Sequence, residues 1–113
     1  MSDCLFCKII DGSIPSKKVY EDDEILAFED VNPQAPTHIL VIAKLHRSTL
    51  LELEESDKET IGKIYLVINK LAREKGIDDG FRVVANCGEK AGQSVFHIHF
   101  HLLGGRSFMW PPG

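Results

Sequence analysis

The chain of 113 residues has 43% hydrophobic and 27% charged residues, as in one soluble globular domain, so we expect a single domain over residues 1–113. The 17 acidic residues exceed the 13 basic ones, the formal charge is −4 and no basic run occurs, so no nucleic-acid partner is expected. No apolar run reaches the ~18 residues of a membrane span, and no charged-then-apolar leader is found, so neither a membrane partner nor secretion is expected.

The elements expected in the first half of the chain are, in order, a short helix over 4–10, strands over 18–21 and 25–29 joined by a turn, a loop over 30–36 and a strand over 37–43. The helix is indicated by apolar residues at helical spacing, and it ends before Gly12 and Pro15. Two prolines exclude regular structure from the loop. The strand after it is apolar on both faces, which is typical of a central strand.

The elements expected in the second half are a short helix over 48–54, a long helix that follows it, a strand over 81–85, a polar loop over 86–94 and a strand over 95–103. Ser56 and Glu59 predict a capping box at the start of the long helix, and Gly76 predicts its end. Its expected buried stripe consists of Ile61, Ile64, Tyr65, Ile68, Leu71 and Ala72. The order of elements predicts an α+β fold with one antiparallel five-stranded sheet, one long helix and a short N-terminal helix.

Three of the five histidines stand at alternate positions of the last strand, as His97, His99 and His101. Successive side chains of a strand point to opposite faces, so these imidazoles would share one face, ~6.5–7 Å apart. Any polar residue would serve an exposed face. Three histidines in register therefore indicate a site for acid–base, nucleophilic or metal chemistry.

The loop before this strand ends in Gly92-Gln93-Ser94. Glycine allows the backbone to approach a ligand closely, and backbone N–H groups with a serine hydroxyl suit a phosphate. The same residues also make ordinary turns. Beside imidazoles that can act as nucleophiles, the loop favours phosphoryl or nucleotidyl transfer, and no Walker A, Rossmann or serine-hydrolase motif offers another route.

The three cysteines are an odd number, which does not suggest a disulfide framework. Cys4 and Cys7 form a Cys-x-x-Cys pair, which in a reducing compartment indicates metal or redox chemistry, so we expect a cytoplasmic location. With His46 and one strand histidine the pair is a candidate tetrahedral metal site, although the spacing is not that of a zinc finger. The alternative is two small buried residues on a short helix.

Several other residues have two interpretations. His38 is either a hydrogen-bonded structural residue or one that orients a catalytic imidazole. Asp30 is either an exposed turn residue or a ligand of two ribose hydroxyls. Five apolar residues are either core or the floor of a pocket for a flat base, namely Leu5, Phe6, Ile9, Phe28 and Val31.

At His97-Ile98-His99-Phe100-His101-Leu102-Leu103 the chain resembles the histidine triad (HIT) superfamily, whose motif is His-x-His-x-His followed by apolar residues. The resemblance extends over nearly the whole chain. Further matching segments are Phe6-Cys7-Lys8-Ile9-Ile10, Ile14-Pro15, Phe28-Glu29-Asp30, Pro36-Thr37-His38 and Gly92-Gln93-Ser94-Val95. The ending Trp110-Pro111-Pro112-Gly113 is similar to the Hint-like branch.

The resemblance implies a homodimer whose protomers join their sheets, and hydrolysis of purine nucleoside 5′-phosphoramidates or acyl-AMP. His99 would be the nucleophile that forms a nucleotidyl-histidine intermediate, His101 would contact the phosphate or leaving group, and His38 would support them. The residues implied to bind phosphate are Asn86, Gly92, Gln93 and Ser94. Asp30 would hold the ribose, and the five apolar residues would hold the purine.

The resemblance also implies a structural zinc ion, because many members have a Cys pair, a later histidine and the first triad histidine as ligands. The corresponding residues are Cys4, Cys7, His46 and His97. Members with this C-terminus often lack the cysteines, so His97 could be a ligand or a catalytic partner. Two alternative functions are a dinucleoside polyphosphate hydrolase, against which the C-terminal tetrapeptide argues, and a nucleotide-binding regulatory module with little turnover.

Overall fold

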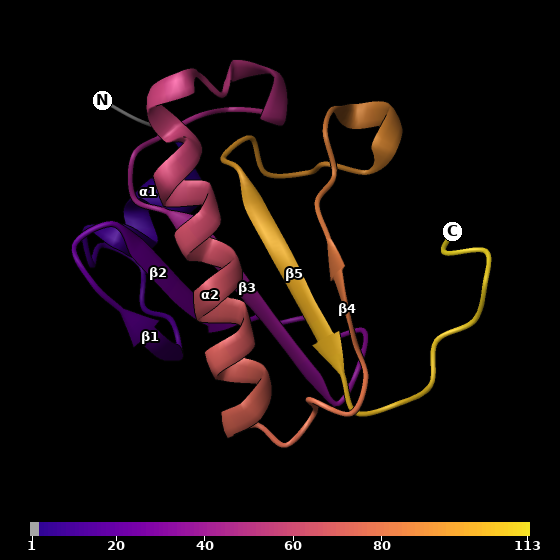
Figure 1. Ribbon diagram of the computed structural model, residues 1–113. Helices are drawn as coiled ribbons and strands as arrows, with labels where there is room; N and C mark the ends of the chain where they lie inside the picture. Colours follow the sequence, from indigo (N-terminus) through magenta and orange to yellow (C-terminus); the bar gives the residue numbers. More distant parts are fainter. Residues whose placement is uncertain (1–2) are drawn as a thin grey trace.

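A five-stranded antiparallel sheet forms the centre of the computed structural model, which describes residues 3–113. The strands are β1 (Lys18–Glu21), β2 (Ile25–Glu29), β3 (Thr37–Ala43), β4 (Phe81–Val84) and β5 (His99–Gly104), and they lie in the order β1-β2-β3-β5-β4 (Figure 1). The helices are α1 (Leu5–Ile10) and α2 (Lys58–Glu74), with short 3-10 turns η1 (Leu50–Glu52), η2 (Glu55–Asp57) and η3 (Glu89–Ala91). The predicted α+β architecture is confirmed.

The central strand β3 is buried on both faces, as its apolar sequence predicts. Ile39 and Val41 pack into the core beneath α2, whereas Leu40 and Ile42 pack into a second core beneath α1. The sheet therefore has a helix on each face. Because side chains alternate along a strand, the neighbours of these residues on β5 divide in the same way.

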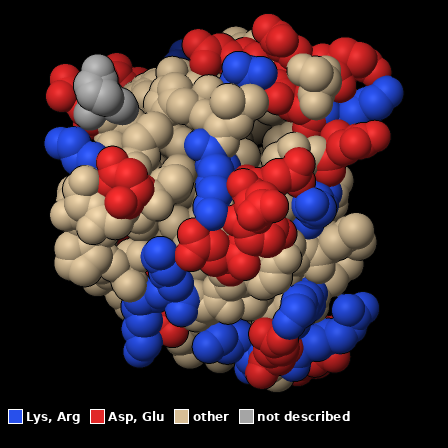
Figure 2. Space-filling model, turned by 90° about the vertical axis from the view of Figure 1, so that its left-hand side faces the viewer, with Lys and Arg blue, Asp and Glu red and all other residues tan. Residues whose placement is uncertain are grey.

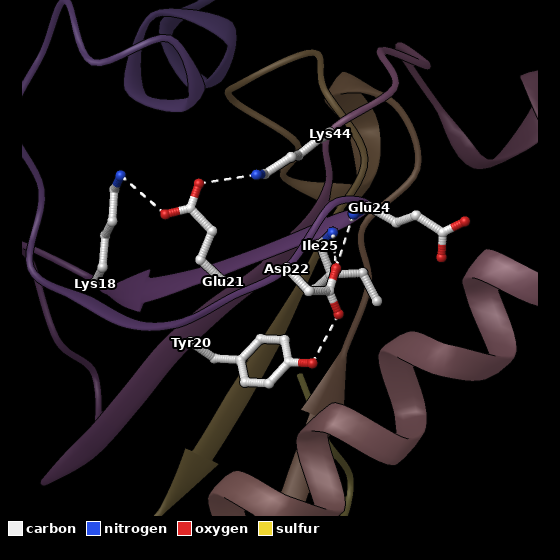
Figure 3. A network of polar contacts seen from close by, with 7 residues as sticks. All are labelled: Lys18, Tyr20, Glu21, Asp22, Glu24, Ile25 and Lys44. Atoms are coloured by element: carbon white, nitrogen blue, oxygen red, sulfur yellow. Dashed lines mark hydrogen bonds and ion pairs between the residues drawn. The ribbon is translucent and has the colours of Figure 1, made fainter.

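The hairpin between β1 and β2 depends on Asp22, which lies in its turn (Figure 3). One carboxylate oxygen of Asp22 accepts hydrogen bonds from the backbone N–H groups of Glu24 and Ile25, each at 2.8 Å, and the Tyr20 hydroxyl donates to the other oxygen at 2.7 Å. An aspartate at the first position of a turn commonly satisfies backbone donors in this way. This explains why the predicted turn and both strand ranges are confirmed.

The long helix α2 begins at Lys58, one residue later than a cap at Ser56 requires. Ser56 lies in η2, whose capping box includes the Asp57 carboxylate; this carboxylate accepts the Glu54 backbone N–H at 2.8 Å and a hydrogen bond from the Arg47 guanidinium at 3.0 Å. The predicted Ser56–Glu59 box is therefore wrong, because Asp57 is the N-cap of α2 and makes no side-chain cap hydrogen bond there. In residues 3–113 no helix is long and apolar enough to cross a membrane.

The buried stripe of α2 differs from the predicted one at Tyr65, which is 46% exposed and packs its ring against Phe100 at 5.6 Å. Val67 is buried instead, because it lies beside Ile64 and Ile68 on the helix surface that contacts the sheet. Gly76 follows the helix with a φ of +71°, a conformation that favours glycine, as the predicted helix end requires.

Two short segments differ from prediction. The helix expected over 48–54 is only the 3-10 turn η1, and the strand expected over 81–85 ends at Val84. Gly104 at the end of β5 lies so close to Ile77 that a β-carbon there would be 2.4 Å from its Cδ1. The C-terminal end of the sheet can therefore approach the segment after α2 only with glycine at this position.

The predicted histidine strand is shorter than its alternating sequence indicates. β5 begins at His99, and residues 95–97 form a bend instead. The partner strand β3 ends at Ala43, opposite the start of β5, so the preceding residues have no strand to pair with. The N–H of Ile98 donates to the Arg47 carbonyl at 2.8 Å. The expectation that three histidines share one strand is thus wrong, because His97 precedes it.

Acidic and basic side chains are interspersed over the face on the β1 side of the molecule (Figure 2). Several form ion pairs between elements, such as Lys63 with Glu24 at 2.7 Å and Lys44 with Glu21 at 2.8 Å. Exposed pairs of this kind contribute little to stability, typically about 0.2–1 kcal/mol. On this face the basic side chains form no continuous patch of the kind that a nucleic acid would need.

Candidate active site

Two imidazoles of β5 lie side by side on the face of the sheet that α1 covers. The rings of His99 and His101 are 5.0 Å apart, and Phe6 of α1 packs edge-on against His99 at 5.1 Å. His99 is 7% exposed and His101 is half-buried. Burial removes water from both rings, so their hydrogen bonds determine which nitrogen carries a proton.

The hydrogen bond of His99 leaves a lone pair on its Nε2. Its Nδ1 lies 2.7 Å from the backbone carbonyl oxygen of His97, and a carbonyl can only accept, so Nδ1 carries the proton. The other nitrogen of a neutral imidazole is then unprotonated. This tautomer is the one that a nucleophilic Nε2 requires.

His38 on β3 determines the opposite tautomer for His101. The backbone N–H of Gln34 donates to His38 Nδ1 at 3.0 Å, so the proton of neutral His38 lies on Nε2. That Nε2 lies 2.9 Å from His101 Nδ1, which accepts, and 3.3 Å from a carboxylate oxygen of Asp30. His101 therefore carries its proton on Nε2, where it can be donated.

Burial keeps this pair of histidines neutral. Desolvation lowers the pKa of His101 to about 4, and the neighbouring His99 and His38 add to the effect. Desolvation also lowers the pKa of His38, although the Asp30 carboxylate opposes it. At neutral pH both rings are uncharged, so the hydrogen-bond chain just described holds.

A cavity of about 380 Å³ opens beside these histidines. Its polar lining consists of Ser16, Glu29, Asp30, Ser94, His99 and His101. Its apolar lining includes all five residues predicted to hold a base, which are Leu5, Phe6, Ile9, Phe28 and Val31, together with Ile14, Pro15, Leu40 and Val95. The volume and the mainly apolar wall suit a small organic ligand with a flat ring.

The five apolar residues are not all core residues. Phe6, Ile9 and Phe28 are buried, whereas Leu5 is 43% and Val31 99% exposed at the cavity edge. Val31 is therefore not a core residue. All five residues line the cavity, and their contact with a base stays a prediction.

Three of the predicted phosphate ligands do not line the cavity, namely Asn86, Gly92 and Gln93. The amide of Gln93 donates to the carbonyls of Ser48 at 2.8 Å and Val95 at 3.1 Å, and its oxygen accepts the Gly88 N–H at 2.8 Å. The N–H groups of Gly92 and Gln93 are bonded within the loop itself. Gly92 has a φ of +97°, so the loop turn requires it.

The second constellation brings together Cys4, Cys7, His46 and His97, whose ligand atoms all lie within 4.8 Å of one another. The Nδ1 of His97 is 3.3 Å from Cys4 Sγ, 3.6 Å from Cys7 Sγ and 3.2 Å from His46 Nδ1. A tetrahedral zinc ion with bonds of ~2.3 Å to sulfur and ~2.05 Å to nitrogen places sulfur and nitrogen ligands ~3.5 Å apart and two nitrogens ~3.3 Å apart. The donor set fits such an ion.

In both cluster histidines, the ring nitrogen that points away from the cluster has an oxygen partner, as is usual in metal-binding histidines. His97 is fully buried, and its Nε2 donates to the Ala43 carbonyl at 2.7 Å, so Nδ1 has the lone pair that a ligand needs. His46 has its Nε2 at 3.3 Å from the Ser48 hydroxyl. Metal-binding histidines usually have such an oxygen partner on the second nitrogen.

A further group of metal-type side chains consists of Asp30, His38 and His101. Here the Gln34 N–H occupies His38 Nδ1, so Nε2 carries a proton and has no lone pair for a metal. The group therefore suits proton transfer, whereas the Cys–His group suits a metal. The resemblance implies different roles for the three triad histidines, and in the structure their rings differ in hydrogen-bond partners.

Sequence reasoning missed the close pairing of Asp30 with His38. These residues flank the proline-containing loop, and the Asp30 N–H donates to the His38 carbonyl at 3.0 Å. Two strands joined by a short loop are commonly antiparallel neighbours, so that pairing was available as a signal. The contribution of Leu40 and Ile14 to the cavity had no local signal, because both look like ordinary core residues.

A larger hollow of about 630 Å³ lies elsewhere, between the end of α2 and the C-terminal segment. It contains Arg82 and Arg106, which both stack on the Phe108 ring. Their N–H groups donate to the carbonyls of Met109 and Gln34. With its arginines engaged, this hollow lacks the convergent reactive groups of the histidine cavity.

The fold and the histidine cavity together define a protein of the histidine triad type, and comparison with known proteins agrees. The family model described as "Scavenger mRNA decapping enzyme C-term binding" matches residues 3–109. The chain belongs to this family, within the histidine triad superfamily.

Individual relatives are similar over nearly their whole length. A "14 kDa zinc-binding protein" of Zea mays is 51% identical over 99% of this chain and 89% of its own. The crystal structure of a HIT family hydrolase from Legionella pneumophila has a TM-score of 0.96 at 49% identity, covering 98% and 100% of the two chains. A histidine triad nucleotide-binding protein from Candida albicans has a TM-score of 0.84 at 34% identity, covering 96% and 83%.

Proposed function

We propose that this protein is a nucleotide hydrolase that cleaves purine nucleoside 5′-phosphoramidates, and also acyl-AMP, through a nucleotidyl-histidine intermediate on His99. The observation that carries the proposal is the tautomer pair in one cavity, an unprotonated Nε2 on His99 next to a protonated Nε2 on His101. The names of the hydrolase from Legionella pneumophila and the nucleotide-binding protein from Candida albicans support it.

In the proposed complex the purine lies against the apolar wall, and Asp30 accepts hydrogen bonds from the ribose hydroxyls. The phosphate then lies beside Ser94 and the two imidazoles, which line the same cavity. The Ser94 hydroxyl donates to a phosphate oxygen. Holding the phosphorus next to a fixed nucleophile supplies much of the catalysis, because the reaction needs little further loss of orientational freedom.

The lone pair of His99 Nε2 attacks phosphorus, a P–N bond to His99 forms, and the bond to the leaving amine breaks. His101 Nε2–H provides the proton that the amine nitrogen takes up. The ring of His99 gains positive charge in the adduct, and the His97 carbonyl that accepts its Nδ1–H at 2.7 Å stabilises this charge. Water then attacks phosphorus from the same cavity, and the P–N bond to His99 breaks. One proton of the water returns to His101 Nε2, so AMP is released and both imidazoles are neutral again.

The other predicted residues act less directly in this proposal. His38 fixes the tautomer of His101 and does not touch the substrate. Gln93 and Gly92 shape the loop that presents Ser94, because their polar groups are already bonded within the protein. Asn86 stays a predicted phosphate ligand.

We further propose that Cys4, Cys7, His46 and His97 bind a structural zinc ion. The distances and second hydrogen bonds of the donors support this, as does the name of the relative from Zea mays. The ion supplies a cross-link when bound and takes no part in the phosphorus chemistry. Metal analysis of protein purified without a histidine tag tests it, and less than ~0.2 zinc per chain would contradict a nearly full site.

We also propose a homodimer in the cytoplasm. In residues 3–113, β4 is an edge strand whose one partner is β5, so its outer edge offers backbone groups to a second sheet. Tyr65, Leu66 and Trp110 are exposed apolar residues that such an assembly could cover. Sedimentation should give twice the 12.7 kDa mass of the chain.

Hydrolysis of adenosine 5′-phosphoramidate tests the activity. Wild type should release AMP, and His99→Ala should release it at least about 10³-fold more slowly, because a covalent nucleophile has no substitute. Cys87→Ser, at a half-buried cysteine outside both clusters, serves as the control and should match wild type. Equal AMP release by wild type and His99→Ala would contradict the mechanism, and tight AMP binding without any hydrolysis would favour a regulatory module.

A further inference from the structure

We infer that the Cys4–Cys7–His46–His97 cluster, when it holds a metal, positions α1 as a wall of the nucleotide cavity and thereby sets the affinity for the nucleotide. This inference rests on the proposed function, because it assumes that the cavity binds a nucleotide and that the cluster binds a metal. It assigns to the cluster a role in ligand binding in addition to stability.

The first observation is that α1 belongs to both sites. The helix begins immediately after Cys4, whose Sγ accepts the Cys7 N–H at 3.3 Å, and Cys7 lies within the helix. The same helix supplies Leu5, Phe6 and Ile9 to the cavity lining. The six residues from Cys4 to Ile9 therefore include both thiols of the cluster and three of the five residues predicted to contact the base.

The second observation is that α1 has little stability of its own. It has only six residues, and isolated helices shorter than ~12–15 residues are marginal in water. Two of its side chains, Phe6 and Ile9, are buried against the sheet, whereas Leu5 is 43% exposed, so few apolar contacts hold the helix in place. A cross-link at the start of the helix adds to this limited packing.

The third observation is that the cluster connects α1 to the residues that hold the nucleophile. His97 directs its Nδ1 at the two sulfur atoms, while its carbonyl accepts the proton of His99 Nδ1 at 2.7 Å. Phe6 packs edge-on against both rings, at 6.0 Å from His97 and 5.1 Å from His99. Displacement of α1 would therefore change both the apolar wall of the cavity and the packing around His99.

The expected size of the effect follows from the fraction of molecules in which α1 is docked. The apparent affinity is the intrinsic affinity multiplied by this fraction. If removal of the metal leaves α1 docked in about one molecule in ten, AMP binding weakens about tenfold. A role limited to global stability predicts something different. It would lower the melting temperature but leave the affinity of the folded protein for AMP unchanged.

The experiment measures AMP binding by titration calorimetry on full-length protein that is zinc-loaded, chelator-treated and reloaded, with zinc content determined for each sample. Hydrogen exchange of backbone amides in the same samples compares α1 with β3. We expect removal of zinc to weaken AMP binding about tenfold and to speed exchange in α1 more than in β3, with reloading restoring both. Circular dichroism verifies that the zinc-free protein remains folded.

Variants separate the cluster from cysteine chemistry in general. Cys7→Ser should reproduce the zinc-free values, whereas Cys87→Ser, which changes a cysteine outside the cluster, should match wild type. AMP affinity and α1 exchange that are unchanged in folded zinc-free protein would overturn the inference while leaving the proposed function intact. A zinc-loaded protein that does not bind AMP would instead overturn the proposed function, and the inference with it.

Discussion

At the scale of single residues, the candidate site depends on which nitrogen of each imidazole carries the proton. A backbone carbonyl determines this for His99 and His97, and a backbone N–H determines it for His38. Backbone groups cannot change their donor or acceptor character, so each tautomer is fixed by the fold. Side chains of one chemical type therefore differ in which ring nitrogen carries the proton.

Replacement of His38 tests this relay. His38→Ala removes the donor to His101 Nδ1, so we expect kcat for the phosphoramidate to fall about 10–100-fold, as for other supporting groups, with little change in AMP affinity. His38→Gln retains an N–H donor and should recover part of the loss. Steady-state kinetics provide the measurement, and equal kcat values for wild type and His38→Ala would contradict the relay.

Gly104 provides a second test at this scale. In Gly104→Ala the new β-carbon would lie 2.4 Å from Ile77 Cδ1, and overpacking of this kind costs about 1–3 kcal/mol of unfolding free energy. Gly62→Ala is the matched control, because nothing lies within 4 Å of its position in α2. Urea denaturation should show a loss for Gly104→Ala and a gain of up to about 1 kcal/mol for Gly62→Ala. A neutral Gly104→Ala would show that Ile77 moves freely.

At the scale of elements, the candidate site is built from three segments. His99 and His101 lie at the start of β5, the apolar residues come from the six-residue helix α1, and Asp30 lies in the loop after β2. Regular elements fix these ends because backbone hydrogen bonds and the two cores hold the strands. The precision of the site therefore depends on how well each turn is defined.

The hairpin turn offers a test at this scale. Asp22→Ala removes an acceptor for two backbone N–H groups and for the Tyr20 hydroxyl, so we expect a loss of about 1–3 kcal/mol in unfolding free energy. Asp23→Ala changes the exposed neighbour and should cost less than about 0.5 kcal/mol. Chemical denaturation of both variants makes the comparison, and equal losses would exclude a special role for Asp22.

At the scale of the whole molecule, burial of neutral histidines couples stability to pH. The folded chain holds the pKa of His101 at about 4 and lowers the pKa of His38, in both cases mainly by desolvation. The histidines of the unfolded chain have ordinary pKa values near ~6.5. Between pH ~4 and pH ~6.5 the unfolded chain therefore binds more protons than the folded chain. This contribution to stability is complete above pH ~6.5 and is lost as the pH falls toward ~4.

The melting temperature should therefore fall as the pH is lowered from about 7.5 to about 5. His101→Gln cannot take up this proton, so its melting temperature should fall less over the same interval, even if its value at the higher pH is lower than that of wild type. Thermal denaturation followed by circular dichroism gives both slopes. Identical slopes would mean that His101 contributes nothing to the pH dependence.

Most of the fold could be predicted because local patterns determine it. The ranges of β1, β2 and β3 were predicted to the residue, since alternating or continuous apolar runs are bounded by turn residues and prolines. Predictions failed where a distant partner decides the outcome. The 3-10 turn η2, in which Asp57 pairs with Arg47, precedes α2 where a cap at Ser56 was expected, and the end of β3 at Ala43 stops β5 from extending to His97.

For the candidate site, the sequence by itself determined which chemical groups are present: the alternating imidazoles, the Cys-x-x-Cys pair and the apolar residues placed beside Asp30. Only the tertiary structure decided how they divide. The bend before β5 moves His97 to the two thiols, while β3 brings His38 to His101. The physical reason is that a tautomer depends on its hydrogen-bond partners, and those partners are backbone groups and side chains from other segments.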